Sequence, residues 1–282
     1  MKGIILSGGQ GTRLFPLTKS ISKQLLPIYD KPMIYYPLST LMSLGIKKFL
    51  IITNNFYLEN YKLLLQDGSQ WGIEIDYEIQ ENPNGIAEAF LIGKNFIDSD
   101  PVTLILGDNI FYGLDFNKEI IDINKNAYIY LFKVANPNRY GVANFKNNKI
   151  ISIEEKPKNP RSEYAVTGLY RYPNNVIDYV KKIKPSKRNE LEITDLNNLY
   201  IKKNKLNAIK MQKGSVWLDA GTTSSIVQAS QFVQTIQDRQ NILFGSPEAI
   251  SLLNKWISKS KFIKLIKNSP ENDYYKYLKK II

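Results

Sequence analysis

A glycine-rich segment near the start of the chain is the strongest chemical signal in the sequence. Residues 6–14 read LSGGQGTRL and directly follow a short apolar run. Glycines at the end of a strand let backbone N–H groups approach a phosphate closely, and such groups form an anion-binding nest. Arg13 and Lys23 add fixed positive charge nearby. The segment therefore predicts a site for the phosphates of a nucleotide.

Three nucleotide-binding patterns compete for this segment, with a plain glycine-rich turn as the structural alternative. A Walker A loop is excluded because no Gly-Lys-Ser/Thr follows. The dinucleotide pattern is met at Gly9 and Gly11, but Leu14 stands in place of its third glycine. Asp30 has the spacing of a ribose-binding acid, yet it lies in a Tyr-Asp-Lys-Pro turn rather than at a strand end. A nucleotidyltransferase loop, with Arg13 beside the glycines, fits best.

The chain of 282 residues contains no His and no Cys, which narrows the chemistry further. These absences exclude a Ser-His-Asp triad, an imidazole base, a haem-binding His, a thiol nucleophile, Cys-bound zinc and a disulfide framework. The chemistry must therefore use carboxylates, Lys, Arg, Tyr, hydroxyls, backbone amides or a metal ion bound by oxygen. Oxygen ligands favour Mg²⁺, Mn²⁺ or Ca²⁺.

The first hundred residues alternate between strand and helix patterns. Strands are predicted over residues 2–6, 48–52, 73–79 and 102–106, and helices over residues 33–44, 57–65 and 86–96. This alternation predicts an α/β fold with a Rossmann-like, mostly parallel mixed sheet flanked by helices. Ligands of such sheets bind at the carboxyl ends of the strands. The glycine-rich loop and Asp108, which each follow a strand, are therefore expected at the same edge.

The remainder of the chain is richer in strands at first and helical towards its end. Strand patterns cover residues 128–134, 142–145, 150–153 and 165–172, and helix patterns cover 174–183, 195–202, 224–240 and most of 246–282. There is no Ser/Gly-rich linker, internal repeat or low-complexity tract. The fold class therefore includes a helical C-terminal part.

The net charge is +12, from 38 Lys and Arg against 26 Asp and Glu. The lysines recur along the whole chain together with Asn and Ile, so we interpret the charge as a compositional habit rather than a binding surface. The apolar runs have strand length, and the first residues lack the run of a signal peptide. The lack of Cys also fits a reducing compartment. We expect a cytoplasmic protein that binds neither nucleic acid nor a membrane.

A series of short blocks, in order along nearly the whole chain, closely resembles the bacterial sugar-1-phosphate nucleotidyltransferases. The resemblance is strongest to the branch of this family that transfers a thymidylyl group. The blocks are residues 8–14, 16–18, 23–27, 31–38, 80–87, 107–113, 140–142, 154–157, 164–170, 190–195 and 217–219.

The resemblance implies that dTTP and glucose 1-phosphate are converted to dTDP-glucose and pyrophosphate. A phosphate oxygen of the sugar phosphate attacks the α-phosphorus in line with the departing pyrophosphate. Because the attacking phosphate is already anionic, catalysis depends mainly on positioning and charge stabilisation, which suits a chain without His. The implied product supplies deoxysugar precursors such as dTDP-rhamnose for polysaccharide biosynthesis.

The resemblance assigns catalytic roles to four residues. Asp108 and Asp219 are expected to hold Mg²⁺, which binds one or two protein carboxylates together with phosphate oxygens and water. Arg13 and Lys23 are expected to face the triphosphate and the charge that develops at the α-phosphorus. The structural alternatives are a turn or cap for Asp108, a helix cap near Thr222 for Asp219, and solvated surface charge for the two cations.

Further residues are expected to bind the substrates, again by resemblance. Lys156, with help from Arg188, would neutralise the sugar phosphate, and Glu155 would accept hydrogen bonds from sugar hydroxyls. Gln24 and Gln80 would bind the base, and the alternative for both is an exposed polar side chain. For Tyr140 and Tyr170 the structural alternative, and the default, is packing in the hydrophobic core. The full set comprises Gly8, Gly9, Gly11, Thr12, Arg13, Lys23, Gln24, Gln80, Pro83, Gly85, Asp108, Asn109, Tyr140, Gly141, Glu155, Lys156, Val166, Thr167, Gly168, Tyr170 and Arg188.

The family pattern divides the chain near residue 223. Residues 1–223 are expected to form the catalytic domain, including inserted sugar-binding strands. Residues 224–282 are expected to support packing of a homo-oligomer, a tetramer by resemblance, and a second, regulatory nucleotide site near residues 111–113.

Several other functions stay open at this point. The same chemistry with UTP or another nucleotide is the nearest, although residues 23–27 favour the thymidylyl branch. A non-catalytic sugar-nucleotide sensor on the same fold would be expected to lack a metal carboxylate or the Arg, and neither is missing. A nucleic-acid binder would show a stripe of basic and aromatic residues, which the sequence does not contain.

Overall fold

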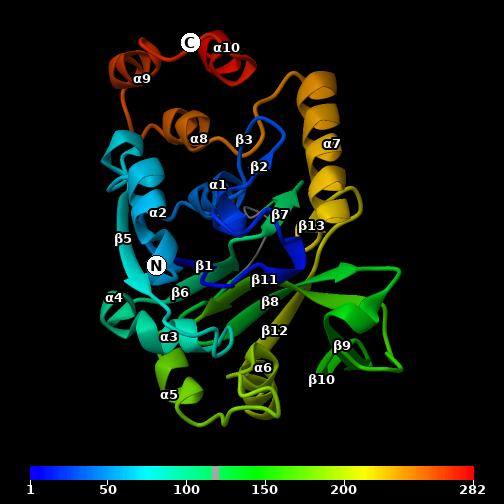
Figure 1. The fold of residues 1–282 in the computed structure, drawn as a ribbon. Helices are drawn as coiled ribbons and strands as arrows, with labels where there is room; N and C mark the ends of the chain where they lie inside the picture. The colour runs from blue at the N-terminus through cyan, green and yellow to red at the C-terminus, as the bar shows by residue number, and fades with distance from the viewer. Residues whose placement is uncertain (116–120) are drawn as a thin grey trace.

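The predicted strands of the first hundred residues form the parallel half of a nine-stranded sheet (Figure 1). The computed structural model describes residues 1–115 and 121–282. All neighbours in this half pair in parallel, in the spatial order β5-β4-β1-β6. Its strands are β1 (Lys2–Ser7), β4 (Lys48–Thr53), β5 (Glu74–Ile79) and β6 (Val102–Leu106).

The other half of the sheet is largely antiparallel and is organised around the long strand β11 (Tyr164–Tyr172). This strand pairs antiparallel with β6, β8 and β9, while β12 pairs in parallel with β8. The predicted mixed sheet is therefore confirmed. The strands that complete it are β8 (Ala127–Lys133), β9 (Gly141–Lys146), β10 (Lys149–Glu155) and β12 (Leu206–Lys210).

Two hydrophobic cores cover the two faces of the sheet, because successive side chains of a strand point to opposite faces. Ile4 packs in one core and Ile5 in the other, and both are fully buried. The Ile4 core is closed by α3 (Glu88–Ile92), α5 (Val176–Val180) and α6 (Ile193–Lys202). The Ile5 core is closed by α1 (Tyr35–Ser43) and α2 (Leu58–Leu65).

Several expected elements differ in the structure. The single helix expected over residues 86–96 is wrong: it divides into α3 and α4 (Lys94–Ile97) at Gly93, a poor helix former that packs closely on the sheet. A methyl group at Gly93 would lie 3.0 Å from Ile4 Cδ1. Strands that the sequence patterns did not predict are β2 (Pro27–Ile28), β3 (Lys31–Pro32), β7 (Asn109–Tyr112), β12 and β13 (Val216–Asp219).

The C-terminal helices lie above α1 and along one side of the molecule in the view of Figure 1, where they are drawn in yellow to red. A buried polar cluster ties them to the β2–β3 hairpin. Lys31 Nζ donates to Gln237 Oε1 at 3.0 Å, and Gln237 Nε2 donates to Asp30 Oδ2 at 3.0 Å. Burial lowers the pKa of Lys31. The helices are α7 (Thr223–Gln240), α8 (Pro247–Leu253), α9 (Lys259–Ile266) and α10 (Asp273–Lys280).

Within the described residues, none of the helices is both long enough and apolar enough to cross a bilayer.

Candidate active site

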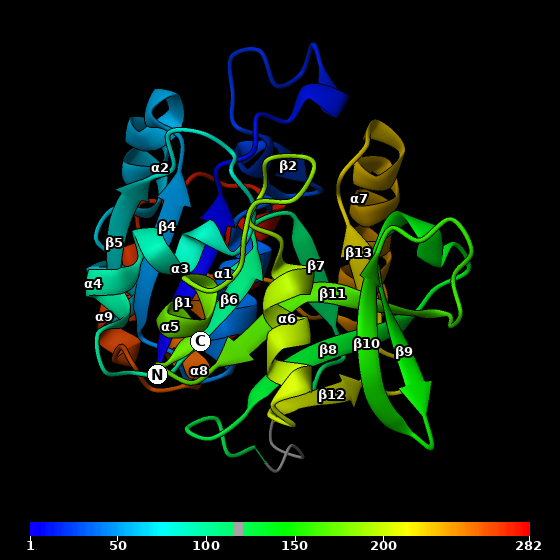
Figure 2. The ribbon, with the colours of Figure 1, turned by 90° about the horizontal axis from the view of Figure 1, so that it is seen from below.

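A cavity of about 460 Å³ opens at the carboxyl ends of β1 and β6. Ligands of open α/β sheets bind at this edge, and the volume is in the range of small-molecule sites. The glycine-rich segment follows β1 and loops out beyond the sheet edge, in dark blue in Figure 2. Gly8, Gly9 and Arg13 from this segment line the cavity together with Asp108. The expected meeting of the glycine-rich loop and Asp108 is confirmed.

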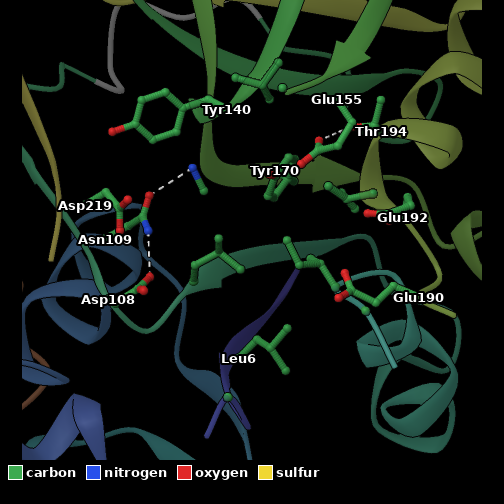
Figure 3. A pocket seen from close by; sticks show the side chains of 18 of the residues that line it. Leu6, Asp108, Asn109, Tyr140, Glu155, Tyr170, Glu190, Glu192, Thr194 and Asp219 are labelled. Atoms are coloured by element: carbon green, nitrogen blue, oxygen red, sulfur yellow. Dashed lines mark hydrogen bonds between the residues drawn. The ribbon is translucent and has the colours of Figure 1, made fainter. Parts of the chain in front are cut away.

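A two-stranded ribbon brings the two predicted metal carboxylates together. Strands β7 and β13 pair antiparallel, with Asn109 opposite Asp219. The pairing continues one step further, where the Ala220 N–H donates to the Asp108 carbonyl at 3.0 Å. Asp108 and Asp219 therefore lie side by side at the cavity wall, although they are far apart in the sequence (Figure 3).

Lys23 forms an ion pair with Asp108 Oδ2, and the lysine side chain is only 7% exposed. Burial raises the pKa of Asp108, but the charge and hydrogen bond of Lys23 and a hydrogen bond from Asn109 outweigh it, so the net pKa lies below its usual value. For Asp219, burial and the neighbouring Asp108 charge raise the pKa. The carboxylates of Asp108 and Asp219 thus lie in a partly desolvated environment in which an added positive charge is favourable.

This donor set fits Mg²⁺. Magnesium uses one or two protein carboxylates and completes its shell with phosphate oxygens and water. Among the residues that the structure describes, no group of three or more His, Cys, Asp or Glu side chains is arranged for a metal ion. The protein part of such a site would therefore be Asp108 and Asp219, and the remaining ligands would come from the substrate.

Arg13 lies close to Asp219. A methyl group at Gly221 would lie 3.0 Å from Asp219 Oδ1 and 3.3 Å from Arg13 Nη2, so the guanidinium and the carboxylate border one small space. The helix-cap alternative for Asp219 does not hold, because Thr222 caps α7 by accepting from the Ser225 N–H. Asp219 is therefore free of a capping role and faces the cavity.

The side-chain amide of Asn109 links Asp108 to strand β11. Its Nδ2 donates to Asp108 Oδ1 at 2.8 Å (Figure 3). Its Oδ1 accepts from Trp217 Nε1 at 2.6 Å and from the Gly168 N–H at 3.0 Å. A methyl group at Gly168 would lie 2.5 Å from Asn109 Oδ1. Only glycine allows β11 to approach this amide so closely.

The far end of the cavity carries a carboxylate surrounded by donors. Glu155 Oε2 accepts from Thr194 Oγ1 at 2.7 Å (Figure 3). Its Oε1 lies 3.6 Å from Lys156 Nζ and 3.8 Å from Arg188 Nη2. Gly141 stands close to the same carboxylate and lines the cavity with it. Acceptors and cations side by side suit a ligand that bears both hydroxyl groups and an anion.

The loop expected to bind the base is fixed by its backbone to Leu191. The Leu191 N–H donates to the Asn84 carbonyl at 2.6 Å, and the Ala87 N–H donates to the Leu191 carbonyl at 3.1 Å. Gly85 lies between them with φ +109°, a conformation that only glycine adopts readily. Gln80 and Gly85, which belong to this loop, both line the cavity.

We expect Gly85→Ala to lower the free energy of unfolding by about 2–3 kcal/mol. The added methyl group would lie 2.4 Å from the Leu191 carbonyl oxygen, which the backbone hydrogen bonds hold in place. Gly214→Ala is the matched control, because Gly214 also has a positive φ, +89°, but no atom within 4 Å of an added Cβ. Urea unfolding of both variants measures the difference. Equal losses would contradict the role of the Leu191 contact.

Comparison with known proteins agrees with this geometry. A family model described as nucleotidyl transferase matches residues 2–236. Glucose-1-phosphate thymidylyltransferase of Neisseria meningitidis serogroup A is 48% identical over 100% of this chain and 99% of that protein. The enzyme of the same name from Mycolicibacterium smegmatis is 45% identical, with the same two coverages. The chain belongs to the nucleotidyltransferase family.

Solved structures resemble this nucleotidyltransferase in fold as well. One from Bacillus anthracis, described as a candidate glucose-1-phosphate thymidylyltransferase in complex with sucrose, is 41% identical with a TM-score of 0.78. It covers 88% of this chain and 98% of its own. A UDP-glucose pyrophosphorylase in complex with UDP-glucose is 25% identical with a TM-score of 0.73, covering 83% and 98%. The predicted family and fold are confirmed.

Most residues predicted to bind substrates line the cavity of this nucleotidyltransferase, but four do not. Gly11 and Thr12 belong to the glycine-rich loop but do not line the cavity, and Lys23 is buried against Asp108. The Thr167 hydroxyl donates to the Tyr130 carbonyl at 3.0 Å and is fully buried, so the sheet already uses it.

Other lining residues received no role in the sequence analysis. Blocks 190–195 and 217–219 contained several of them, and their presence in those blocks was the available signal. The residues are Leu6, Ile86, Leu106, Arg139, Glu190, Glu192, Ile193, Thr194, Asn197 and Trp217.

Proposed function

We propose that this nucleotidyltransferase transfers a thymidylyl group from dTTP to glucose 1-phosphate, with Mg²⁺, and releases pyrophosphate. The observation that carries the proposal is the position of Asp108 and Asp219 with Arg13 in one cavity with the glycine-rich loop, where the buried Lys23 pairs with Asp108. The names of relatives that are 45–48% identical over nearly their whole length support the choice of substrates.

Catalysis in this site rests on charge and position. Asp108 and Asp219 would hold the Mg²⁺, and when bound the ion supplies positive charge to the triphosphate. Arg13 and Lys23 stabilise the charge that develops around the α-phosphorus as the bond to pyrophosphate breaks. The sugar phosphate already carries the attacking oxygen as an anion, so no general base is required. This agrees with a cavity that contains no His.

The two ends of the cavity position the reactants. Lys156 and Arg188 neutralise the phosphate of the sugar, and Glu155 accepts hydrogen bonds from its hydroxyl groups. Gln24 and Gln80 contact the base next to the backbone of Gly85. Holding both reactants in line replaces a bimolecular encounter by a step within one complex, which contributes a large part of the rate.

The direct test is an assay of purified protein with dTTP, glucose 1-phosphate and Mg²⁺, following pyrophosphate. Release well above a protein-free control, and its loss when the metal is chelated, is the expected result. Competition among dTTP, UTP, ATP and CTP separates the main proposal from its nearest alternative, since a UDP-glucose pyrophosphorylase shares the fold. Faster turnover with UTP than with dTTP would replace the proposed nucleotide.

Glu155→Gln is expected to raise the KM for glucose 1-phosphate about tenfold, with little change in the KM for dTTP. The amide keeps the shape of the side chain but weakens acceptance from sugar hydroxyls and leaves the two nearby cations less well paired. Glu163→Gln, the same change at an exposed glutamate, is the control. A similar rise for both substrates would argue against a sugar-specific contact.

We infer that residues 1–223 form the catalytic domain and that the helices from residue 224 onward pack subunits of a homotetramer, with a regulatory nucleotide site near residues 111–113. The enzyme would act in the cytoplasm, early in the formation of deoxysugar nucleotides such as dTDP-rhamnose. Light scattering of the purified chain tests the tetramer.

A further inference from the structure

At the base end of the cavity a carboxylate stands directly behind Gln80. Glu88 is the first residue of α3 and is half-buried. Its Oε2 accepts from Gln80 Nε2 at 2.7 Å, and its Oε1 accepts from Asn84 Nδ2 at 2.9 Å. Glu88 therefore accepts hydrogen bonds from the side-chain amides of Gln80 and Asn84 at once, and Gln80 itself lines the cavity.

The carboxylate decides which end of the Gln80 amide faces the cavity. An ionised carboxylate and a backbone carbonyl can only accept hydrogen bonds. Gln80 Nε2 has one partner of each kind, Glu88 Oε2 and, at 3.4 Å, the Gly85 carbonyl. The NH₂ end must therefore point to them, and the oxygen end points away. A methyl group at Gly8 would lie 2.4 Å from Gln80 Oε1, which places this oxygen against a residue of the cavity wall.

The amide of Gln24 is held differently. Its Oε1 accepts from the Ser22 hydroxyl at 2.9 Å and from the Tyr61 hydroxyl at 3.3 Å. A hydroxyl group donates or accepts according to its rotation, so these partners do not impose one orientation on an amide. Of the two glutamines proposed to contact the base, only Gln80 has a hydrogen-bond partner that can only accept, and this partner fixes the orientation of its amide.

The Gln80 carbonyl oxygen, held at the cavity wall as a hydrogen-bond acceptor, pairs with a base that donates from N3. N3 of thymine and uracil carries a hydrogen and donates, whereas N3 of cytosine is itself an acceptor. We propose that Glu88 is a positioning residue that selects bases with an N3–H, because it keeps the carbonyl oxygen of Gln80 turned toward the base. The inference rests on the proposed function, in which Gln80 contacts the base.

The test measures binding of dTTP and dCTP by calorimetry without sugar phosphate, in the wild type and in Glu88→Gln and Glu88→Ala. Glutamine at residue 88 can accept with its oxygen or donate with its NH₂, so both orientations of Gln80 become allowed. We expect the preference for dTTP over dCTP to fall about tenfold in both variants, a typical effect of one well-placed hydrogen bond. Glu81→Gln makes the same change at an exposed position of the same loop, and its preference should stay within twofold of the wild type.

Kinetics give a second readout, with the KM for dTTP rising while kcat stays within about threefold. An unchanged dTTP/dCTP ratio in both variants overturns the inference, and so does equal weakening for both nucleotides, which indicates only support of the α3 N-terminus. A wild type without base preference also overturns it. A wild type that prefers dTTP but releases no pyrophosphate contradicts the proposed reaction instead and leaves base selection standing.

Discussion

Replacing Asp108 by Asn is expected to lower kcat about a thousandfold while the protein stays folded. Asparagine has the shape of aspartate but carries no charge, so the acidic pair loses half of its charge. The electrostatic stabilisation that Asp108 and Asp219 give together cannot be recovered from the remaining carboxylate. Pyrophosphate release at saturating substrates measures the loss.

Stability should respond much less than activity to the same change. Asp108→Asn breaks the ion pair with the buried ammonium of Lys23, but it also removes the repulsion that raises the pKa of Asp219, and Asp219 can partly neutralise the lysine. We expect a loss of about 2 kcal/mol in the free energy of unfolding, smaller than for a buried ion left with no partner. Asp76→Asn, at an exposed position of β5, is the control for the substitution itself. More than a tenth of wild-type turnover in Asp108→Asn would contradict the role of Asp108.

The sequence predicted the edge of the sheet at which the cavity opens, because that edge depends on local patterns. A strand followed by a glycine-rich turn, and a second apolar strand followed by Gly-Asp, place Gly8 and Asp108 together once both strands join one parallel sheet. Hydrophobic periodicity is sufficient for that inference. The family blocks added Asp219, whose neighbourhood carries no comparable local signal.

The rest of the site depends on contacts between distant segments. The β7–β13 ribbon that pairs Asn109 with Asp219 consists of two four-residue strands outside the main sheet, too short for a periodic pattern. The Asn109 hydrogen bond to Trp217 and the Glu88 hydrogen bond to Gln80 depend on where the folded backbone places these side chains. A single sequence does not encode such partners in its spacing.

Replacing Lys23 by Met is expected to separate two properties that usually change together. Turnover should fall about a hundredfold or more, because the ammonium group no longer stabilises charge near the α-phosphorus. Affinity for a divalent cation without nucleotide should rise about tenfold, since Lys23 now neutralises Asp108 in the free protein and competes with an added cation. Methionine has a similar length and fits a position that is only 7% exposed.

Titration with Mn²⁺, followed by electron paramagnetic resonance, measures the affinity for the cation independently of turnover. Lys19→Met removes the same charge from an exposed position of the same loop, and both quantities should stay close to the wild type. If Lys23 were only a structural support for the loop, Lys23→Met would weaken cation binding and turnover in parallel. Opposite changes require that Lys23 and the cation act on the same carboxylate.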